Sequence, residues 1–294
     1  MAEGIIVKSL SGFYYVRSDV GVIYQCRARG NFRKRKITPL VGDHVIFEAD
    51  NRTDGYVLEI GERKNRLIRP PVANVDQALL VFSVKEPDLH LQLLDKFLVH
   101  IEANEIVPVI CLTKTDLLHN SERTLFSDTA KIYQSIGYRV FFVSSYTGEG
   151  LEGLYPVVKN RISVVAGQSG VGKSSLLNAL EPALDIETGR ISSHLGRGKH
   201  TTRHVELLPV AGGLVADTPG FSSLDFHDMD EQDLPFFFPE MKTLQVDCKF
   251  RGCTHLSEPG CAVKQNYEEG KIAPSRYKHY RMFYQEIKEK KRRY

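Results

Sequence analysis

The sequence predicts a multidomain protein with a small N-terminal β-barrel, a central α/β domain and a mainly helical C-terminal domain. Five short β-rich runs fill the first 68 residues, and strand-like and helix-like segments alternate from about residue 70. A cluster of cysteines and a histidine then precedes a long helical pattern. With 294 residues, the chain is long enough for two or three hydrophobic cores. We expect domains at 1–68, 69–222 and 223–294.

The composition is that of an ordinary soluble globular protein, with 42% hydrophobic and 26% charged residues. No apolar run is long enough to cross a bilayer, and the N-terminus MAEGIIVKSL lacks a signal-peptide pattern. The five cysteines are too few and too unevenly placed for a secreted disulfide framework. Cys26 and Cys111 lie in apolar runs and are expected to be buried. We expect a cytoplasmic monomer without a membrane partner.

Positive charge is concentrated in two segments, although the net charge is only +3. Residues 264–294 hold ten Lys/Arg against four Asp/Glu, a net of +6, and residues 27–36 hold six Lys/Arg and no acid. One charged run is usually a solvated face. Two separate basic segments, one with interleaved aromatics, favour a polyanionic partner such as nucleic acid. Membrane binding through residues 264–294 is a weaker alternative, because their aromatic side chains are spaced for packing.

The N-terminal runs are separated by turn signals such as Ser11-Gly12 and Asp54-Gly55. Five short strands in fewer than seventy residues fit an OB-fold, a five-stranded barrel. The basic residues 27–36 would lie in a loop between strands, and OB-folds bind oligonucleotides on such surfaces. A barrel used only for packing is the alternative. The five runs are GIIVKSL, FYYVRS, GVIYQCRAR, DHVIFEAD and GYVLEIGE.

The central segment alternates continuous apolar runs with helix-like segments around 89–103, 122–136 and 173–180. Such strands with intervening helices are typical of a parallel sheet covered on both faces. This is a nucleotide-binding architecture. The strand-like runs stop after Phe221. The apolar runs are ALLVFSV, VPVICL, YRVFFVSS and ISVVAG.

A complete GxxxxGK[ST] motif stands between the strand-like ISVVA and the helix-like SSLLNAL. Its glycines let backbone N–H groups surround phosphate oxygens, and the following helix adds the positive end of its dipole. Lys173 would neutralise the β- and γ-phosphates, and Ser174 would supply a hydroxyl to Mg²⁺. A fortuitous Gly-rich turn is disfavoured by the flanking strand and helix. The expected nucleotide-binding residues here are Gly167, Gln168, Ser169, Gly170, Val171, Gly172, Lys173, Ser174 and Ser175.

The base is indicated by Thr113-Lys114-Thr115-Asp116, which follows the strand-like VPVICL. A carboxylate at Asp116 can accept hydrogen bonds from the ring N–H and the amine of guanine, which adenine cannot offer. The stem of Lys114 would pack along the nucleotide. Ser144-Ser145, about thirty residues later, could contact guanine through backbone N–H groups. Alone the first motif could be a strand-end turn, but with the phosphate loop and the serines it favours GTP.

Asp217-Thr218-Pro219-Gly220 follows the strand-like GGLVA. At a strand end beside a phosphate loop, Asp217 would hold Mg²⁺ through water and the Gly220 N–H would reach the γ-phosphate. The Gly-rich basic loop GRGKHTTR precedes it. One of its threonines would complete the Mg²⁺ shell. We favour Thr202, with little to separate it from Thr201.

The motifs occur in a rearranged order. In a conventional GTPase the phosphate loop comes first, whereas here residues 113–116 and 144–145 precede it. With this circular permutation and with GQSGVGKS, GRGKHTTR and DTPGF, the whole chain resembles the small-subunit-dependent GTPases of the RsgA family, also called YloQ or YjeQ. The resemblance implies a maturation factor for the small ribosomal subunit. It would bind that subunit and its rRNA, act alongside other assembly factors, and hydrolyse GTP slowly until the subunit stimulates it.

Phe221 stands where many GTPases carry a water-orienting glutamine. A phenyl ring can neither orient nor polarise the attacking water, so the sequence independently predicts slow intrinsic turnover. Another group must act on the water. We nominate His200 in the GRGKHTTR loop as a catalytic residue together with Thr202. An equally good alternative is that His200 only touches phosphate or RNA.

Cys248, Cys253, His255 and Cys261 lie within fourteen residues. Three thiols and one imidazole fill the four tetrahedral positions of a structural zinc, which leaves none open for catalysis. The spacing is not the common CxxC, and the family resemblance strengthens the assignment. One Zn²⁺ per chain would contribute on the order of 10–16 kcal/mol to the folding of this small module. Unligated reduced cysteines are the alternative.

From Ser275 onward, Tyr277, Tyr280, Tyr284 and Ile287 follow helical spacing. DTPGF leads directly into an acidic linker and this zinc module. We hypothesise that contact between Gly220 and the γ-phosphate reorients the module and its basic tail. Two rival functions are a static RNA-binding protein whose nucleotide only stabilises the fold, and a P-loop kinase or ATPase, which Asp116 disfavours.

Overall fold

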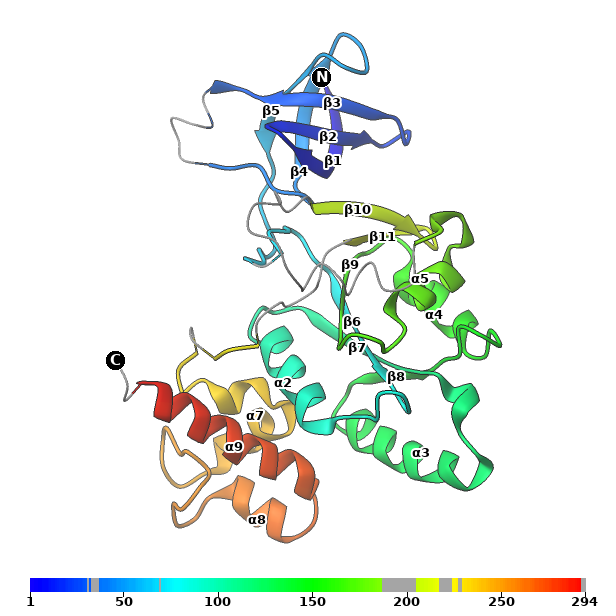
Figure 1. Ribbon diagram of the computed structural model, residues 1–294. Helices are drawn as coiled ribbons and strands as arrows, with labels where there is room; N and C mark the ends of the chain where they lie inside the picture. The colour runs from blue at the N-terminus through cyan, green and yellow to red at the C-terminus, as the bar shows by residue number, and fades with distance from the viewer. Residues whose placement is uncertain are drawn as a thin grey trace.

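The computed structural model describes residues 1–30, 32, 37–68, 70–186, 205–216, 224–226 and 229–291. Figure 1 shows a β-barrel at one end of the molecule, an α/β domain in the middle and a group of helices at the other end. This arrangement confirms the predicted fold class. No helix in the described ranges is long and apolar enough to cross a bilayer.

The barrel consists of the five strands expected from the sequence. β1 pairs with β2 and β4, β2 pairs with β3, and β5 joins β3 to β4, which closes the barrel. Every second side chain points inward, and Ile6, Val16, Cys26 and Val57 are fully buried. Burial raises the pKa of the Cys26 thiol to about 11, as expected for an inert core cysteine. The strands are β1 (Ala2–Leu10), β2 (Phe13–Ser18), β3 (Ile23–Ala28), β4 (His44–Ala49) and β5 (Gly55–Ile60).

The central sheet has the strand order β10-β11-β9-β6-β7-β8. All of its strands are parallel to their neighbours except β10, which is antiparallel to β11. Both faces are covered, because Leu80 and Phe82 of β6 pack into one core while Leu79 and Val81 pack into another. The strands are β6 (Gln77–Ser83), β7 (Val107–Thr113), β8 (Arg139–Phe142), β9 (Ile162–Ala166), β10 (Val205–Val210) and β11 (Gly213–Ala216).

Helices pack on the two faces of this sheet. The three helix-like segments of the sequence form α2, α3 and α5, close to the expected bounds. α4 was not expected, because its sequence LEGLYPVV contains a glycine and a proline, both weak helix formers. The helices are α2 (Leu91–Glu102), η1 (Thr115–Leu117), α3 (Asn120–Ser135), α4 (Leu151–Val158), α5 (Lys173–Leu180) and η2 (Pro182–Leu184).

The C-terminal part has no strand among residues 224–226 and 229–291. Its core forms around α9, whose Tyr277, Tyr280, Tyr284 and Ile287 are buried as their spacing predicted. The helices are η3 (Leu234–Phe237), α7 (Pro239–Leu244), η4 (Gln245–Asp247), α8 (Ala262–Glu268) and α9 (Pro274–Lys291).

A buried ion network joins this C-terminal part to the central domain. Arg276 of α9 donates to Asp95 of α2 at 2.7 Å and to Glu240 of α7 at 2.7 Å and 3.1 Å. Asp95 also accepts from the hydroxyl of Tyr133 at 2.9 Å and lies 2.5 Å from Nδ1 of His279. Arg276 is only 1% exposed. Arg276, which the sequence analysis included among the cations of residues 264–294, is therefore a buried packing residue.

Candidate nucleotide site and metal centre

The phosphate loop has the local structure that its motif predicts. β9 ends at Ala166, and α5 begins at Lys173. Gly167, Gly170 and Gly172 have φ angles of +146°, +80° and +92°. A Cβ on Gly167 would lie 2.0 Å from the carbonyl oxygen of Val81, so only glycine fits there. The backbone of the loop is therefore tightly folded, as close approach to phosphate requires.

Lys173 points back into this loop. Its Nζ donates to the carbonyl oxygens of Gly167 at 2.9 Å and of Gln168 at 2.5 Å. The residue is 5% exposed, and this burial lowers the pKa of the ammonium to about 8. The ammonium has little contact with water and interacts with carbonyl dipoles, so a bound polyphosphate would stabilise its charge strongly. Ser174, next along α5, is also buried.

The base-recognition segment is tied to the phosphate loop. Thr113, the last residue of β7, is 1% exposed and donates from Oγ1 to the carbonyl oxygen of Val171 at 2.6 Å. Lys114 takes a left-handed backbone conformation, with φ at +60°. Its Nζ donates to the carbonyl oxygen of Glu86. Residues 58 positions apart in the sequence therefore meet at one edge of the sheet.

The serine segment completes the base side of the site. Ser144 donates from Oγ to Oδ1 of Asp116 at 2.6 Å. Its backbone N–H donates to the carbonyl oxygen of Glu149 at 2.9 Å. The N–H of Ser144 is thus already used within the loop, which leaves that of Ser145 for a base. The sequence suggested backbone contacts from both serines, and the role of the Ser144 hydroxyl was missed.

Several expected site residues cannot be placed. His200, Thr201, Thr202, Asp217 and Gly220 lie outside the described residues. Their neighbours are placed: β11 ends at Ala216 and is parallel to β9, with Ala216 opposite Val164.

A second contribution that the sequence reasoning missed is the loop after β6. The carbonyl oxygen of Glu86 accepts the Lys114 hydrogen bond, and Ser83 donates from Oγ to the carbonyl oxygen of Pro87 at 2.6 Å. A Cβ on Gly170 would lie 3.9 Å from Cδ of Pro87. This loop therefore lies between the base-recognition and phosphate segments. Backbone carbonyls and a proline carry no motif, so no sequence signal marked it.

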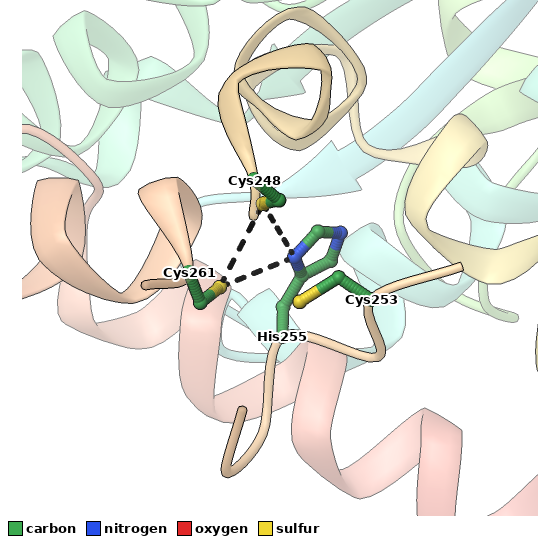
Figure 2. Close-up of side chains that lie close together, drawn as sticks. All are labelled: Cys248, Cys253, His255 and Cys261. Atoms are coloured by element: carbon green, nitrogen blue, oxygen red, sulfur yellow. Dashed lines mark hydrogen bonds between the residues drawn. The ribbon is translucent and has the colours of Figure 1, made fainter. Parts of the chain in front are cut away.

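The four metal-ligand candidates converge, as Figure 2 shows. One potential ligand atom from each of Cys248, Cys253, His255 and Cys261 lies within 4.8 Å of the other three. Nδ1 of His255 lies 3.6 Å from Sγ of Cys248 and 3.3 Å from Sγ of Cys261, and the two sulfurs are 4.0 Å apart. Tetrahedral zinc at ordinary bond lengths requires ligand separations of about 3.5–3.8 Å. The separations among Cys248, His255 and Cys261 bracket these values, and Cys253 lies within 4.8 Å of them, so the four side chains suit such an ion after small adjustments.

Hydrogen bonds hold the loop that carries these candidate ligands. Tyr277 donates to the carbonyl oxygen of His255 and Tyr280 to that of Thr254, both at 2.7 Å. Glu258 accepts from Thr254 through both the backbone N–H and the hydroxyl. Burial raises the pKa of Glu258, but these hydrogen bonds outweigh it and lower that pKa to about 2. The loop is held by α9 and by its own carboxylate.

Comparison with known proteins settles the family. The RsgA GTPase family matches residues 60–227, and the RsgA N-terminal domain matches residues 3–57. The chain belongs to the RsgA GTPase family. It is therefore a GTPase, and its motif order is the circular permutation of that family.

The relatives and solved structures match all or nearly all of the chain. It is 61% identical to "Small ribosomal subunit biogenesis GTPase RsgA" of Shouchella clausii and 60% identical to the protein of that name in Bacillus cytotoxicus, each over 100% of both chains. It is similar to the crystal structure of YloQ, a circularly permuted GTPase, at 49% identity and a TM-score of 0.86, covering 99% of this chain and 96% of that one. It is also similar to the crystal structure of YjeQ from Thermotoga maritima, at 38% identity and a TM-score of 0.87, covering 97% of this chain and 98% of that one.

Proposed function

We propose that this chain is a GTPase that binds the small ribosomal subunit, acts in its late assembly or maturation, and hydrolyses GTP to GDP and phosphate when the subunit stimulates it. The observation that carries the proposal is the match, at about 60% identity over the whole length, to proteins named small ribosomal subunit biogenesis GTPase. GTP and GDP are its nucleotides.

The nucleotide roles rest on the site geometry. Asp116, oriented by Ser144, reads the guanine edge, and the stem of Lys114 lies along the base. Lys173 and the N–H groups of residues 167–174 hold the phosphates, and Ser174 offers its hydroxyl to Mg²⁺, which supplies charge neutralisation when bound. Outside the described residues, Asp217 and Thr202 or Thr201 complete the Mg²⁺ shell, Gly220 contacts the γ-phosphate, and His200 acts on the water.

The metal centre is structural. Cys248, Cys253, His255 and Cys261 hold one Zn²⁺ per chain, and four protein ligands leave no open position for a reacting water. The α9 tyrosines that hold the ligand loop also form the C-terminal core. The ion therefore links α9 to the loops at residues 248–261.

The barrel offers one surface for rRNA. Phe13, Arg27 and Tyr56 are neighbours across β2, β3 and β5. The Arg27 guanidinium lies 5.0 Å from the Phe13 ring centre, and Tyr56 is 45% exposed. Aromatic side chains with a cation between them suit stacked bases and a phosphate backbone. Arg29 adds an exposed cation at the end of the same segment.

The C-terminal cations are fewer than the sequence suggests. Arg276 is buried, and Lys290 and Lys291 form ion pairs with the linker carboxylates of Asp225 and Asp230 at 3.4 Å and 2.9 Å. Lys278 and Arg281 are exposed on α9. We assign the rRNA contact of this domain to those two residues.

The linker after DTPGF is anchored. Phe226 is 2% exposed, and its ring stacks on His100 of α2 at 5.2 Å and contacts Phe283 of α9 at 5.3 Å. Lys96 lies 4.6 Å from the same ring. A γ-phosphate contact by Gly220 would therefore act on an anchored linker, and any reorientation of the C-terminal domain must first break this packing.

GTP turnover with and without purified small subunits, at two salt concentrations, tests the proposal. We expect subunits to raise kcat, and we expect the gain to shrink at high salt because rRNA binding releases counterions. Turnover near zero even with saturating subunits would instead support the static RNA-binding protein.

A further inference from the structure

β1 belongs to two domains at once. Along one edge, residues 4–10 pair with β2, apart from a single irregularity. Along the other edge, residues 2–5 pair with β4 of the barrel, whereas Lys8 and Ser9 pair with Glu206 and Val205 of β10. This pairing makes a single sheet of eleven strands from the barrel and the central domain, and Figure 1 shows β10 next to the barrel.

A β-bulge at Val7 makes this double pairing possible. Ile6 is opposite Val16 and Lys8 is opposite Tyr15, so Val7 has no partner on β2. A bulge bends a strand and increases its twist. The bulge lies between the residues of β1 that pair with β4 and those that pair with β10, and Val7 belongs to the same buried cluster as Val205 and Leu207 of β10. Among the described residues, β1 and β10 therefore meet in a packed core.

An ion pair fixes the register at this junction. Nζ of Lys8 lies 2.7 Å from Oε2 of Glu206, directly across the two strands. The Lys8 ammonium also lies 6.0 Å from the Tyr15 ring centre. The two side chains are 31% and 39% exposed, so either can be replaced without burying a charge.

The β10–β11 hairpin is flanked in the sequence by the two motifs expected to contact Mg²⁺ and the γ-phosphate. GRGKHTTR precedes β10 by one residue, and DTPG follows Ala216, the last residue of β11. Leu207, near the start of β10, is opposite Ala216. Both motifs therefore attach at one end of the hairpin, the end whose outer edge pairs with β1.

We infer that β1 positions the β10–β11 hairpin for hydrolysis, and that the Lys8–Glu206 pair transmits docking of the small subunit on the barrel to the GTPase site. The inference rests on the proposed function. Because the two domains share a packed sheet, a displacement of the barrel moves β10 directly. Lys8 and Glu206 are positioning residues, since both lie outside the nucleotide-binding motifs.

The test compares Lys8→Glu, Glu206→Lys and the double charge exchange with the wild-type chain. Lys131→Glu is the matched control, because it breaks an equally short ion pair with Asp128 on the exposed side of α3. GDP affinity, subunit affinity, intrinsic kcat and subunit-stimulated kcat are measured for each. We expect each single variant to lose about fivefold in stimulated kcat, with the other three quantities unchanged. The double exchange should restore most of the loss, and Lys131→Glu should lose nothing.

Unchanged stimulated kcat in both single variants would overturn the inference. So would a fall in subunit affinity that accounts for the whole loss, because Lys8 would then be an rRNA contact. Failure of the double exchange to recover would show that the pair itself does not transmit docking. If the wild-type chain shows no stimulation, the proposed function fails first, and the coupling fails with it.

Discussion

The hydroxyl of Ser144 lies 2.6 Å from Oδ1 of Asp116 and donates to it. Ser144 is fully buried, whereas Asp116 is exposed, so a hydroxyl held in the protein interior orients a carboxylate that faces solvent. It holds the carboxylate in one orientation before guanine arrives. A carboxylate that is already oriented loses less conformational entropy when it pairs with the two N–H donors of guanine than a mobile one does.

Replacement of Ser144 by alanine should therefore weaken GDP binding without abolishing it. Loss of a hydrogen bond to a charged group costs about 1.5–3 kcal/mol, which is roughly 10- to 150-fold in affinity. Titration of a fluorescent GDP analogue measures this. Ser145→Ala keeps the backbone N–H and serves as the control, with an expected change under about threefold. Equal losses in both variants would contradict the assigned role of Ser144.

Nucleotide affinity should fall at alkaline pH. The Lys173 pKa is lowered to about 8 by burial, so the free protein loses the ammonium as the pH rises through 8, while bound phosphates favour the charged form. Affinity should be flat just below pH 8 and about tenfold weaker one unit above the pKa. Calorimetry from pH 7.5 to 9.5 measures the profile.

Lys173→Met supplies the control for this profile. It removes the titrating group, so its weaker affinity should follow only the pH dependence of guanine itself. The difference between the two profiles isolates Lys173. If the two profiles run parallel, Lys173 does not titrate in this range.

Removal of the metal should unfold the C-terminal core and spare the nucleotide site. Cys261→Ala should carry no zinc and lose the near-ultraviolet circular dichroism of the packed tyrosines Tyr277, Tyr280 and Tyr284. The expected zinc content is one ion per wild-type chain and per chain of Cys26→Ala, a cysteine variant outside the cluster. Retention of the full tyrosine signal without zinc would count against a structural metal.

Arg276→Met should be strongly destabilising. It leaves the carboxylates of Asp95 and Glu240 buried without their shared cation, which typically costs about 3–5 kcal/mol of unfolding free energy. Urea denaturation measures this. Lys131→Met breaks an exposed pair with Asp128 and should cost under about 1 kcal/mol. A loss below about 1 kcal/mol at Arg276 would mean that the network does not hold the two parts together.

The sequence predicted what is encoded locally. The five barrel strands, the buried strands of the central sheet and the packed tyrosines of α9 follow from side-chain periodicity. The convergence of Thr113 with Val171, and of Cys248 with Cys261, followed from motifs whose chemistry requires neighbours.

Contacts between distant segments could not be predicted in this way. The β1–β10 pairing joins residues about two hundred positions apart, and β-strand periodicity does not name a partner. Arg276 shares a helix face with Tyr280 and Phe283, yet its charge argued for solvent. Only Asp95 and Glu240, from two other helices, make its burial possible.

Calorimetric titration of the zinc-loaded chain with GDP and with ADP, in the presence of Mg²⁺, tests most directly whether the permuted motifs form one guanine-nucleotide site. The account predicts one GDP bound per chain, at least about a hundredfold more tightly than ADP, because adenine offers the Asp116 carboxylate neither of the two N–H donors of guanine. No heat from GDP, or equal affinities for the two nucleotides, would contradict it.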